Sequence, residues 1–168
     1  MDLMEQNSEQ FIKLMCNDGI VLMPEYLVQN NKVLMNMKDD GLDLDMTPIN
    51  HNVEDMQNYI SFSELRFRLN LKNDPLNDTI TEQEKDFLQA FEKNELVPEK
   101  KLDKIGHIIS IADFIDNQDI IDVCAKHIGS VFSEMDDIEL MRKILKVTND
   151  LTPEEEEKIR NANLWCKK

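Results

Sequence analysis

The sequence predicts an α+β fold, in which a few short strands near the beginning are followed by helices. Apolar and polar residues alternate beside the turn Asn17-Asp18-Gly19, as is typical of a β-hairpin. Apolar residues recur at helical spacing in the later part of the chain, and the chain ends in a strongly capped helix. This order of elements favours an α+β protein over a doubly wound parallel sheet.

The early part of the chain is expected to form the strands and two short helices. Residues 11–15 alternate between two faces, and residues 20–23 supply the second arm of the hairpin. One helix is expected over residues 24–29 and another over residues 32–37. An acidic loop comes next, and a short strand is expected around Ile49.

Helices are expected through the rest of the chain because apolar residues repeat there every three or four positions. Between residues 70 and 84 the chain is polar and contains one proline, so a loop is expected. Asp136 or Asp137 can cap a later helix, and the last helix begins at Pro153. The other expected helices cover residues 53–65, 86–90, 101–112 and 119–132.

The last helix has the clearest start signals in the sequence. Thr152 is a good N-cap, Pro153 occupies the first helical position, and Glu155 can complete a capping box with Thr152. Four consecutive glutamates place negative charge at the helix start, where the helix dipole favours it. The only tryptophan, Trp165, lies near the chain end, and its large ring needs either the domain or a partner to pack against.

Composition excludes several classes of function. The 168 residues include 34 acidic and 19 basic side chains, so the formal net charge is −15. Such a chain lacks the basic footprint of nucleic-acid binding, and an anionic membrane surface would repel it. No apolar run has membrane-spanning length, and the first residues do not resemble a secretory signal. Three widely spaced cysteines indicate free thiols in a reducing compartment, so we expect the protein in the cytoplasm and nucleus.

No constellation typical of an enzyme, a metal site or a cofactor site stands out. The four glycines form no phosphate-binding loop, and the three histidines are scattered. Cys124 and His127 could face one ion from the same helix, but a structural zinc needs four ligands. Packing is the preferred interpretation of this pair, and a solvated loop that of the aspartates at 39–45. We therefore expect a protein that is not an enzyme and that needs no cofactor or metal.

Three segments of the chain resemble one known family. Residues 149–160 (Asn-Asp-Leu-Thr-Pro-Glu-Glu-Glu-Glu-Lys-Ile-Arg) and the closing residues 163–166 (Asn-Leu-Trp-Cys) are similar to the C-terminus of the S-phase kinase-associated protein family. Residues 111–116 with 121–124 resemble a second segment of that family, and the first strand with its turn resembles a third. Members of this family join F-box proteins to a cullin in SCF ubiquitin ligases.

The resemblance implies a BTB/POZ domain over residues 10–131 that binds a cullin, followed over residues 132–168 by helices that bind an F-box. Two appended helices are then expected at about 135–147 and 153–166. The implied function is that of a non-enzymatic adaptor, which bridges the N-terminal domain of a cullin to F-box substrate receptors for ubiquitin-dependent degradation. By match with the family, the expected F-box-binding residues are Ile121, Cys124, Ile128, Val131, Met141, Leu145, Val147, Leu151, Ile159, Asn163 and Trp165.

The expected cullin contacts are Asp113 and Phe114, where the family usually has Asn-Tyr. Phe114 keeps the ring without its hydroxyl, and Asp113 adds a charge. These changes leave a second interpretation open, in which a BTB-type adaptor binds F-box proteins without recruiting a cullin, in a non-SCF complex or as a competitor. An apolar stripe at helical spacing is more often core than interface. If the last helices stay uncovered, their apolar face also allows the unbound chain to form a homodimer.

Overall fold

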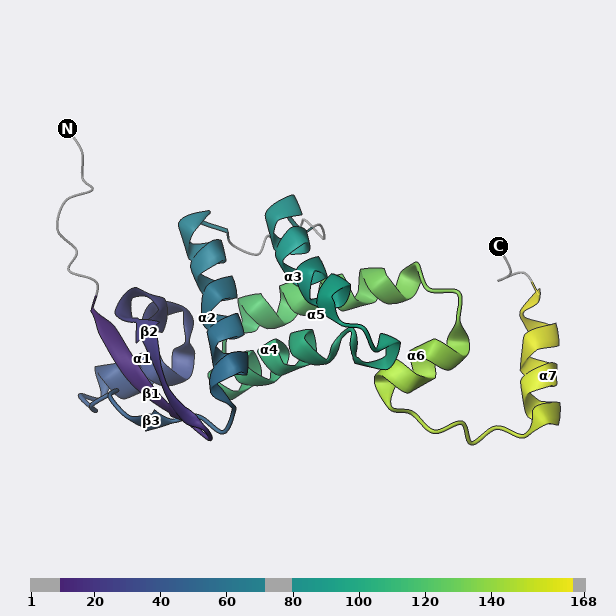
Figure 1. Cartoon of the computed structure of the whole chain (residues 1–168), viewed down its shortest axis with the longest axis horizontal. Coiled ribbons are helices and arrows are strands. Elements are labelled where there is room, and N and C mark those ends of the chain that lie inside the picture. The colour runs from purple at the N-terminus through teal and green to yellow at the C-terminus, as the bar shows by residue number, and fades with distance from the viewer. Residues whose placement is uncertain (1–9, 72–79, 165–168) are drawn as a thin grey trace.

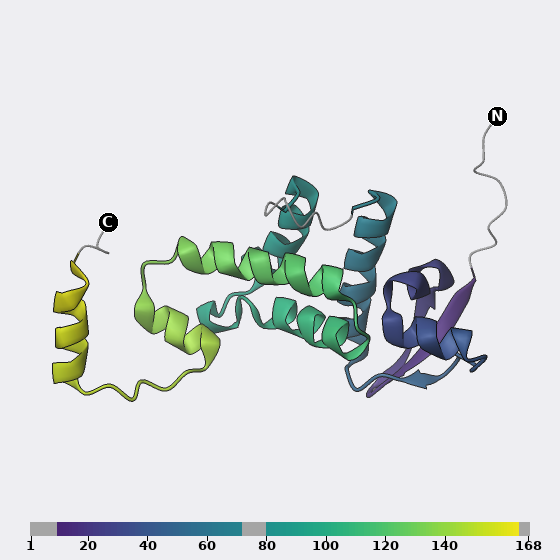
Figure 2. The same cartoon turned by 180° about the vertical axis from the view of Figure 1, so that it is seen from behind.

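The computed structural model describes residues 10–71 and 80–164 of the chain. The sheet lies at one end of the molecule, helices α2 to α5 form its middle, and α6 and α7 lie at the other end (Figure 1). Seen from behind, α4 and α5 run side by side across the middle (Figure 2). The predicted α+β class is confirmed, with a small sheet and its helices followed by two C-terminal helices.

The sheet has three strands in the order β2-β1-β3. Strand β1 (Phe11–Cys16) pairs antiparallel with β2 (Gly19–Pro24), which confirms the predicted hairpin. Strand β3 (Thr47–Pro48) pairs in parallel with β1 and lies just before Ile49, where a strand was expected. Because side chains alternate between the two faces of a strand, every second residue of β1 is buried. These inward-facing residues are Ile12, Leu14 and Cys16.

The helices account for most of the remaining chain. The segment expected to be the first helix is a 3-10 helix, which has poorer hydrogen-bond geometry than an α-helix and is usually short. In chain order the helices are η1 (Glu25–Asn30), α1 (Lys32–Asp39), α2 (Val53–Arg68), α3 (Glu82–Asn94), η2 (Pro98–Lys100), α4 (Asp103–Phe114), α5 (Gln118–Ser133), α6 (Ile138–Leu145) and α7 (Pro153–Ala162).

Helix α3 corrects the sequence prediction, which placed a loop up to residue 84 and a short helix at 86–90. The helix begins at Glu82 because Thr81 and Glu84 form a capping box, with the Thr81 N–H donating to Glu84 Oε2 at 2.9 Å. Glu84 Oε1 also accepts a hydrogen bond from the buried Arg66 of α2. One carboxylate therefore caps α3 and attaches it to α2.

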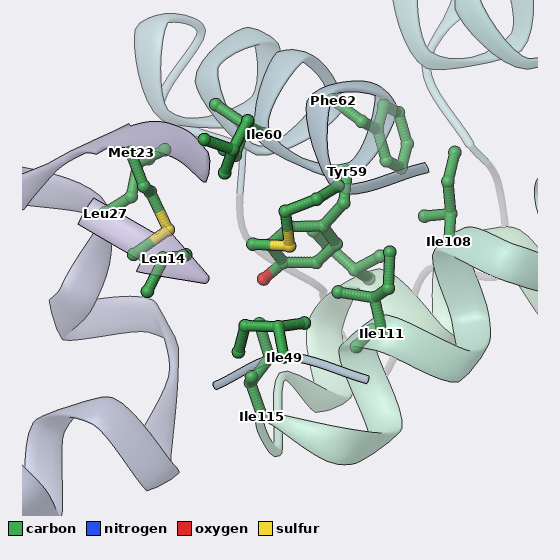
Figure 3. Close-up of a cluster of buried hydrophobic side chains, with 14 of the residues drawn as sticks. Leu14, Met23, Leu27, Ile49, Tyr59, Ile60, Phe62, Ile108, Ile111 and Ile115 are labelled. Atoms are coloured by element: carbon green, nitrogen blue, oxygen red, sulfur yellow. The ribbon is translucent and has the colours of Figure 1, made fainter. Parts of the chain in front are cut away.

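The core lies between the sheet and the middle helices (Figure 3). Tyr59 and Phe62 of α2 are fully buried and lie among side chains from the sheet and from α4. Burial of apolar area removes these side chains from water, which is the main force that holds the sheet against the helices. The other labelled side chains of this cluster are Leu14, Met23, Leu27, Ile49, Ile60, Ile108, Ile111 and Ile115.

A buried polar network ties the turn between α4 and α5 to the rest of the core. The Tyr59 hydroxyl donates to Asn31 Oδ1 and accepts a hydrogen bond from Asn117 Nδ2 at 2.8 Å. Asn31 Nδ2 in turn donates to the Leu27 carbonyl at 2.7 Å. Buried polar groups are costly unless they are paired, so this network favours one arrangement of the turn.

The helices are short, and the longest of them, α2 and α5, have 16 residues each. No helix in the two described ranges combines the length and the apolar character needed to cross a membrane. Helix α5 continues through the predicted domain boundary at residues 131 and 132 and ends at Ser133. The division of the chain into two domains stays a prediction.

Candidate functional site

Helix α6 has two apolar faces, and only one of them is covered. Leu140 and Ile144, four positions apart, pack against the core. Ile138 and Leu145 are 60% and 57% exposed and lie seven positions apart, with the half-buried Met141 between them. Positions i, i+3 and i+7 share one side of a helix, so these three residues form a second apolar face that the chain leaves open.

The ends of α6 are well defined. Asp137 accepts a hydrogen bond from the Leu140 N–H at 3.0 Å, which confirms it as the predicted N-cap. Lys146 adopts a left-handed conformation with φ of 55°, and the Val147 N–H then donates to the Arg142 carbonyl at 2.9 Å. The helix covers Ile138–Leu145, so the expected range of 135–147 was too long at both ends.

Helix α7 stands apart from the middle of the molecule (Figure 1). The predicted capping box is confirmed, because Thr152 Oγ1 accepts from the Glu155 N–H and the Thr152 N–H donates to Glu155 Oε2 at 2.9 Å. The helix ends at Ala162 and not at residue 166 as expected. None of its residues is buried, so packing on the domain does not explain its position.

Polar contacts to Glu156 connect α7 to α6. Arg142 of α6 donates to Glu156 Oε1 at 3.0 Å, and Asn149 Nδ2 donates to the same oxygen at 2.7 Å. These two hydrogen bonds, that from Asn149 first, lower the pKa of Glu156 below its ordinary value. Arg142 also bonds Glu139 at 2.7 Å. We call these four residues the Glu156 cluster.

An open apolar surface follows from this arrangement of α6, α7 and the segment between them. Exposed apolar residues are common singly, but here they recur along α6, the following segment and α7, which makes this end of the chain the candidate interaction site. We call the set the C-terminal apolar surface, and its members are Ile138, Leu145, Val147, Leu151, Ile159 and Leu164.

Several predicted F-box-binding residues belong to this surface. Leu145 and Val147 are each 57% exposed, Ile159 is 50% exposed, and Leu151 is 37% exposed. Asn163 is exposed too, but its Nδ2 donates to the Ile159 carbonyl of its own helix at 2.8 Å. Trp165 lies outside the described residues.

The predicted residues of α5 are placed differently. Ile121, Ile128 and Val131 are half-buried and pack against the core. Cys124 is fully buried, and burial raises the pKa of its thiol to about 12. In the free chain Cys124 therefore belongs to the core, and its predicted contact with a partner stays a prediction.

Sequence reasoning missed two members of the C-terminal apolar surface. Ile138 was expected on the helix but not in the site, and Leu164 was not considered a site residue. The spacing of seven residues from Ile138 to Leu145 is the signal that could have identified Ile138. Which of two apolar faces on α6 is open depends on tertiary packing and could not be read from spacing alone.

The predicted cullin contacts lie at the end of α4. Asp113 is exposed and Phe114 is 47% exposed, while the next residue, Ile115, is fully buried. The Val33 N–H of α1 donates to the Ile115 carbonyl at 3.2 Å, and the Lys32 N–H donates to the Asp116 carbonyl at 3.3 Å. The start of α1 therefore fixes the turn that presents Phe114 to solvent.

The two predicted sites lie toward opposite ends of the molecule. Helix α4 ends on the side of the sheet, where α5 begins, and α5 leads away to α6 (Figures 1 and 2). A helix rises about 1.5 Å per residue, so the 16 residues of α5 span about 24 Å. Partners on the two surfaces could thus be bound at the same time.

The sequence suggested that the three histidines are scattered, but two of them lie close to polar side chains of other elements. His107 Nδ1 lies 3.0 Å from Asp55 Oδ1, and His51 Nε2 lies 3.4 Å from Ser110 Oγ. Burial lowers the pKa of His51. A serine nucleophile needs a histidine that a carboxylate orients, but here Asp55 bonds His107 and not the histidine beside Ser110. This geometry does not favour nucleophilic catalysis.

Cys124 and His127 do not form a metal site with their surroundings. His127 is buried, and its Nε2 lies 2.5 Å from Oε1 of Glu92 on α3. Across the described part of the chain, no group of three or more His, Cys, Asp or Glu residues could hold a metal ion. His127 thus connects α5 to α3 through Glu92, and Cys124 is part of the core.

Comparison with known proteins points to one family. The family model described as "Skp1 family, dimerisation domain" matches residues 118–166, which include α5, α6 and α7. A "Skp1-related protein" of Caenorhabditis elegans is 28% identical over 179 residues, covering 96% of this chain and 94% of that protein. The resemblance indicated by the sequence is therefore confirmed at modest identity.

Two other relatives are more similar over a shorter stretch. "SKP1-like protein 19" of Arabidopsis thaliana is 41% identical over 61 residues, 36% of this chain and 30% of that protein. "SCF ubiquitin ligase complex protein SKP1a" of Dictyostelium discoideum is 39% identical over 59 residues, 35% of this chain and 36% of that protein. The chain thus spans about a third of the length of these two relatives.

Proposed function

We propose that this chain, which is similar to the Skp1 family, is a non-enzymatic adaptor that joins an F-box protein to a cullin in an SCF-type ubiquitin ligase. The C-terminal apolar surface would receive the F-box, and Asp113 and Phe114 would contact the N-terminal domain of the cullin. Such an adaptor acts through proximity, because it presents a tethered substrate at high effective concentration.

The uncovered face of α6 is the observation that supports this proposal most strongly. The helix is already packed on the core through Leu140 and Ile144, whereas Ile138 and Leu145 are mostly exposed and bury little area in the core. Leaving large apolar side chains in water forgoes roughly 25 cal/mol per Å² of stabilisation. A partner with an apolar helical face would recover it, and the family match covers this same part of the chain.

The proposal extends to the remaining predictions about partners and location. The formal net charge of −15 favours protein partners with basic or apolar surfaces over nucleic acid or anionic membranes. A cytoplasmic and nuclear location agrees with thiols that are kept reduced. In the described residues, Cys16 and Cys124 are both free and buried.

Binding of a panel of recombinant F-box domains, measured by isothermal titration calorimetry, tests the first interface. Wild-type protein should bind at least one domain, and Leu145→Ala should weaken that binding about tenfold or more, since a buried leucine contributes about 1.5–3 kcal/mol. The matched control is Leu22→Ala, because Leu22 is 53% exposed on the sheet at the opposite end of the molecule. Equal affinity of wild type and Leu145→Ala would exclude α6 as the docking face.

Binding of a cullin N-terminal domain tests the second interface. Phe114→Ala should reduce it, whereas Phe11→Ala, which removes a ring of similar exposure (45% against 47%) from the outer end of β1, should not. A chain that binds F-box domains but no cullin domain would be the alternative adaptor, which works outside SCF complexes or competes for F-box proteins. Binding of neither partner by folded protein would contradict both versions.

A further inference from the structure

The segment between α3 and α4 exposes apolar side chains beside α6. Leu96 is 92% exposed, more than any other large apolar residue described, and the adjacent Val97 is 40% exposed. Neither residue is needed to close the core, since Leu102 and Ile105 already anchor the start of α4 there. Two adjacent open apolar residues on a connecting segment therefore need an explanation outside the core.

The segment has a defined conformation. The Val97 N–H donates to Glu95 Oε1 at 3.0 Å, and the Lys100 N–H donates to the Val97 carbonyl at 2.9 Å. Pro98 follows at the first position of η2, where its fixed φ suits a helical turn. Leu96 is thus presented by a constrained turn, which lowers the entropic cost of using it in binding.

The same segment is attached to α6, the helix with the open apolar face. Lys143 Nζ lies 3.9 Å from Glu99 Oε1, and Lys146 Nζ lies 3.3 Å from Asp103 Oδ1. Helix α6 lies beside η2 in both views (Figures 1 and 2). Three residues of extended chain span at most about 11 Å, so the backbone of Leu96 lies within that distance of the backbone of Glu99.

We propose that Leu96 and Val97 form an additional edge of the C-terminal apolar surface and contact the F-box that binds there. This inference rests on the proposed function and specifies which further residues of the chain would recognise the partner. The F-box would cover α6 and reach across η2, so an apolar side chain on its near side would pack on Leu96. F-box domains with a polar residue at that point would bind less well.

Charge distinguishes an F-box from a second copy of this chain as the occupant. Lys93, Lys100 and Lys101 lie close in sequence to Glu95 and Glu99, so the segment itself is of mixed charge, whereas the chain as a whole has a formal net charge of −15. A second copy would bring the same net negative charge, which opposes association. A partner that combines apolar side chains with basic ones is favoured instead.

The test compares Leu96→Ala with Leu22→Ala for binding to the F-box domain that wild type binds most tightly. Leu96 is almost fully exposed in the free chain, so its substitution should leave the thermal midpoint unchanged. We expect affinity to fall about tenfold for Leu96→Ala and to stay unchanged for Leu22→Ala. A photo-crosslinking amino acid at position 96 should also form an adduct with the F-box domain, and one at position 22 should not.

The outcomes separate this inference from the proposed function. One outcome excludes the additional edge while the proposed function stands. In it, wild type binds the F-box domain and Leu145→Ala weakens that binding, but Leu96→Ala binds like wild type and no crosslink forms at position 96. If wild type binds no F-box domain, the proposed function fails and this inference fails with it. A crosslink from position 96 to a second copy, with none to the F-box domain, would overturn the assignment of the occupant.

Discussion

Tyr59 is the residue on which the interior polar network depends. Its ring lies among apolar side chains (Figure 3), while its hydroxyl is placed between Asn31 and Asn117. Burial raises the pKa of the Tyr59 hydroxyl to about 12, so the group stays protonated and can donate to Asn31. The network holds the turn after Phe114, and Tyr59 therefore influences the predicted cullin contact from inside the core.

Replacing Tyr59 by phenylalanine should destabilise the protein without changing its shape. The change keeps the ring but removes one hydrogen bond from each of Asn31 and Asn117, which stay bonded to each other at 3.3 Å. Loss of such buried hydrogen bonds costs about 0.5–1.5 kcal/mol each. Urea unfolding followed by circular dichroism measures this difference in the free energy of unfolding. Tyr26→Phe is the matched control, because the Tyr26 hydroxyl is exposed and bonds Glu64 at 3.3 Å, and an equal effect of both changes would contradict the role of the network.

For single residues, the match to the family selected candidate site residues but could not indicate which of them are exposed in the free chain. Leu145, Val147 and Ile159 were chosen for the site and are open, whereas Cys124 was chosen by the same match and is buried. The difference arises because α5 touches neighbours on several sides, so matching residues can face the core. The approach of His51 to Ser110 could not be predicted either, since 59 residues separate them in sequence.

Among the elements, α3 shows how a local signal can be overlooked. The pattern Thr81-x-x-Glu84 is the same capping box as Thr152-x-x-Glu155, which did predict the start of α7 correctly. The first of these capping boxes was missed because residues 70–84 are polar and were therefore expected to form a loop. What the pattern could not indicate is the ion pair of Glu84 with Arg66, because that contact depends on how α2 and α3 pack.

Glu84→Gln should destabilise the protein, because it removes the charged carboxylate that caps α3 and accepts a hydrogen bond from the buried Arg66. Loss of a buried hydrogen bond to a charged group typically costs about 1.5–3 kcal/mol. Chemical denaturation of the full chain measures the loss. The exposed neighbour Glu82, in the same first turn of α3, provides the control variant Glu82→Gln, which should change the free energy of unfolding by less than about 0.5 kcal/mol. Similar small effects of both would show that the pair contributes little.

The position of α7 should depend on pH through Glu156. The pKa of Glu156 is lowered in the folded chain from its ordinary value of 4.5, so its contacts favour the attached helix above that pH. The attachment is lost as the pH falls through the lowered folded value. Nitrogen-15 relaxation should then report faster independent motion of α7 amides, while α5 amides keep the tumbling time of the whole molecule.

The substitution Glu156→Gln removes the charge at neutral pH and should reproduce the low-pH behaviour of α7 there. Glu157→Gln alters the adjacent exposed glutamate and should retain wild-type relaxation at pH 7. High salt should loosen α7 as well, because exposed charges are screened. If α7 moves independently in wild type at pH 7, the Glu156 cluster does not hold it.

On the scale of the whole molecule, the fold places two different surfaces at the two ends of a short helical rod. The pair α4 and α5 forms this rod and is the most extensive helix–helix contact of the structure. The length of this rod follows from helix geometry, whereas packing between elements decides which side chains of each surface are exposed. The proposed bridging function needs both the separation of the two surfaces and their exposure.

The unbound chain should form a weak, concentration-dependent homodimer through the C-terminal apolar surface. Apolar area favours association, but a formal net charge of −15 on each copy opposes it. Sedimentation velocity should show the dimer fraction increase with salt, which screens this repulsion, and decrease in the Leu145→Asp variant. Addition of an F-box domain should convert the dimer into a mixed complex, and a dimer that survives saturating F-box domain must use another surface.

The most direct test of the central claim is to mix the chain with one F-box domain and one cullin N-terminal domain and to measure the mass of the product. Size-exclusion chromatography with light scattering should yield a single complex with one copy of each, and the cullin and F-box domains should not associate when the chain is left out. Phe114→Ala should release only the cullin domain and Leu145→Ala only the F-box domain. Two binary complexes that exclude one another, or no complex with the cullin domain, would contradict the account of this chain as a bridge.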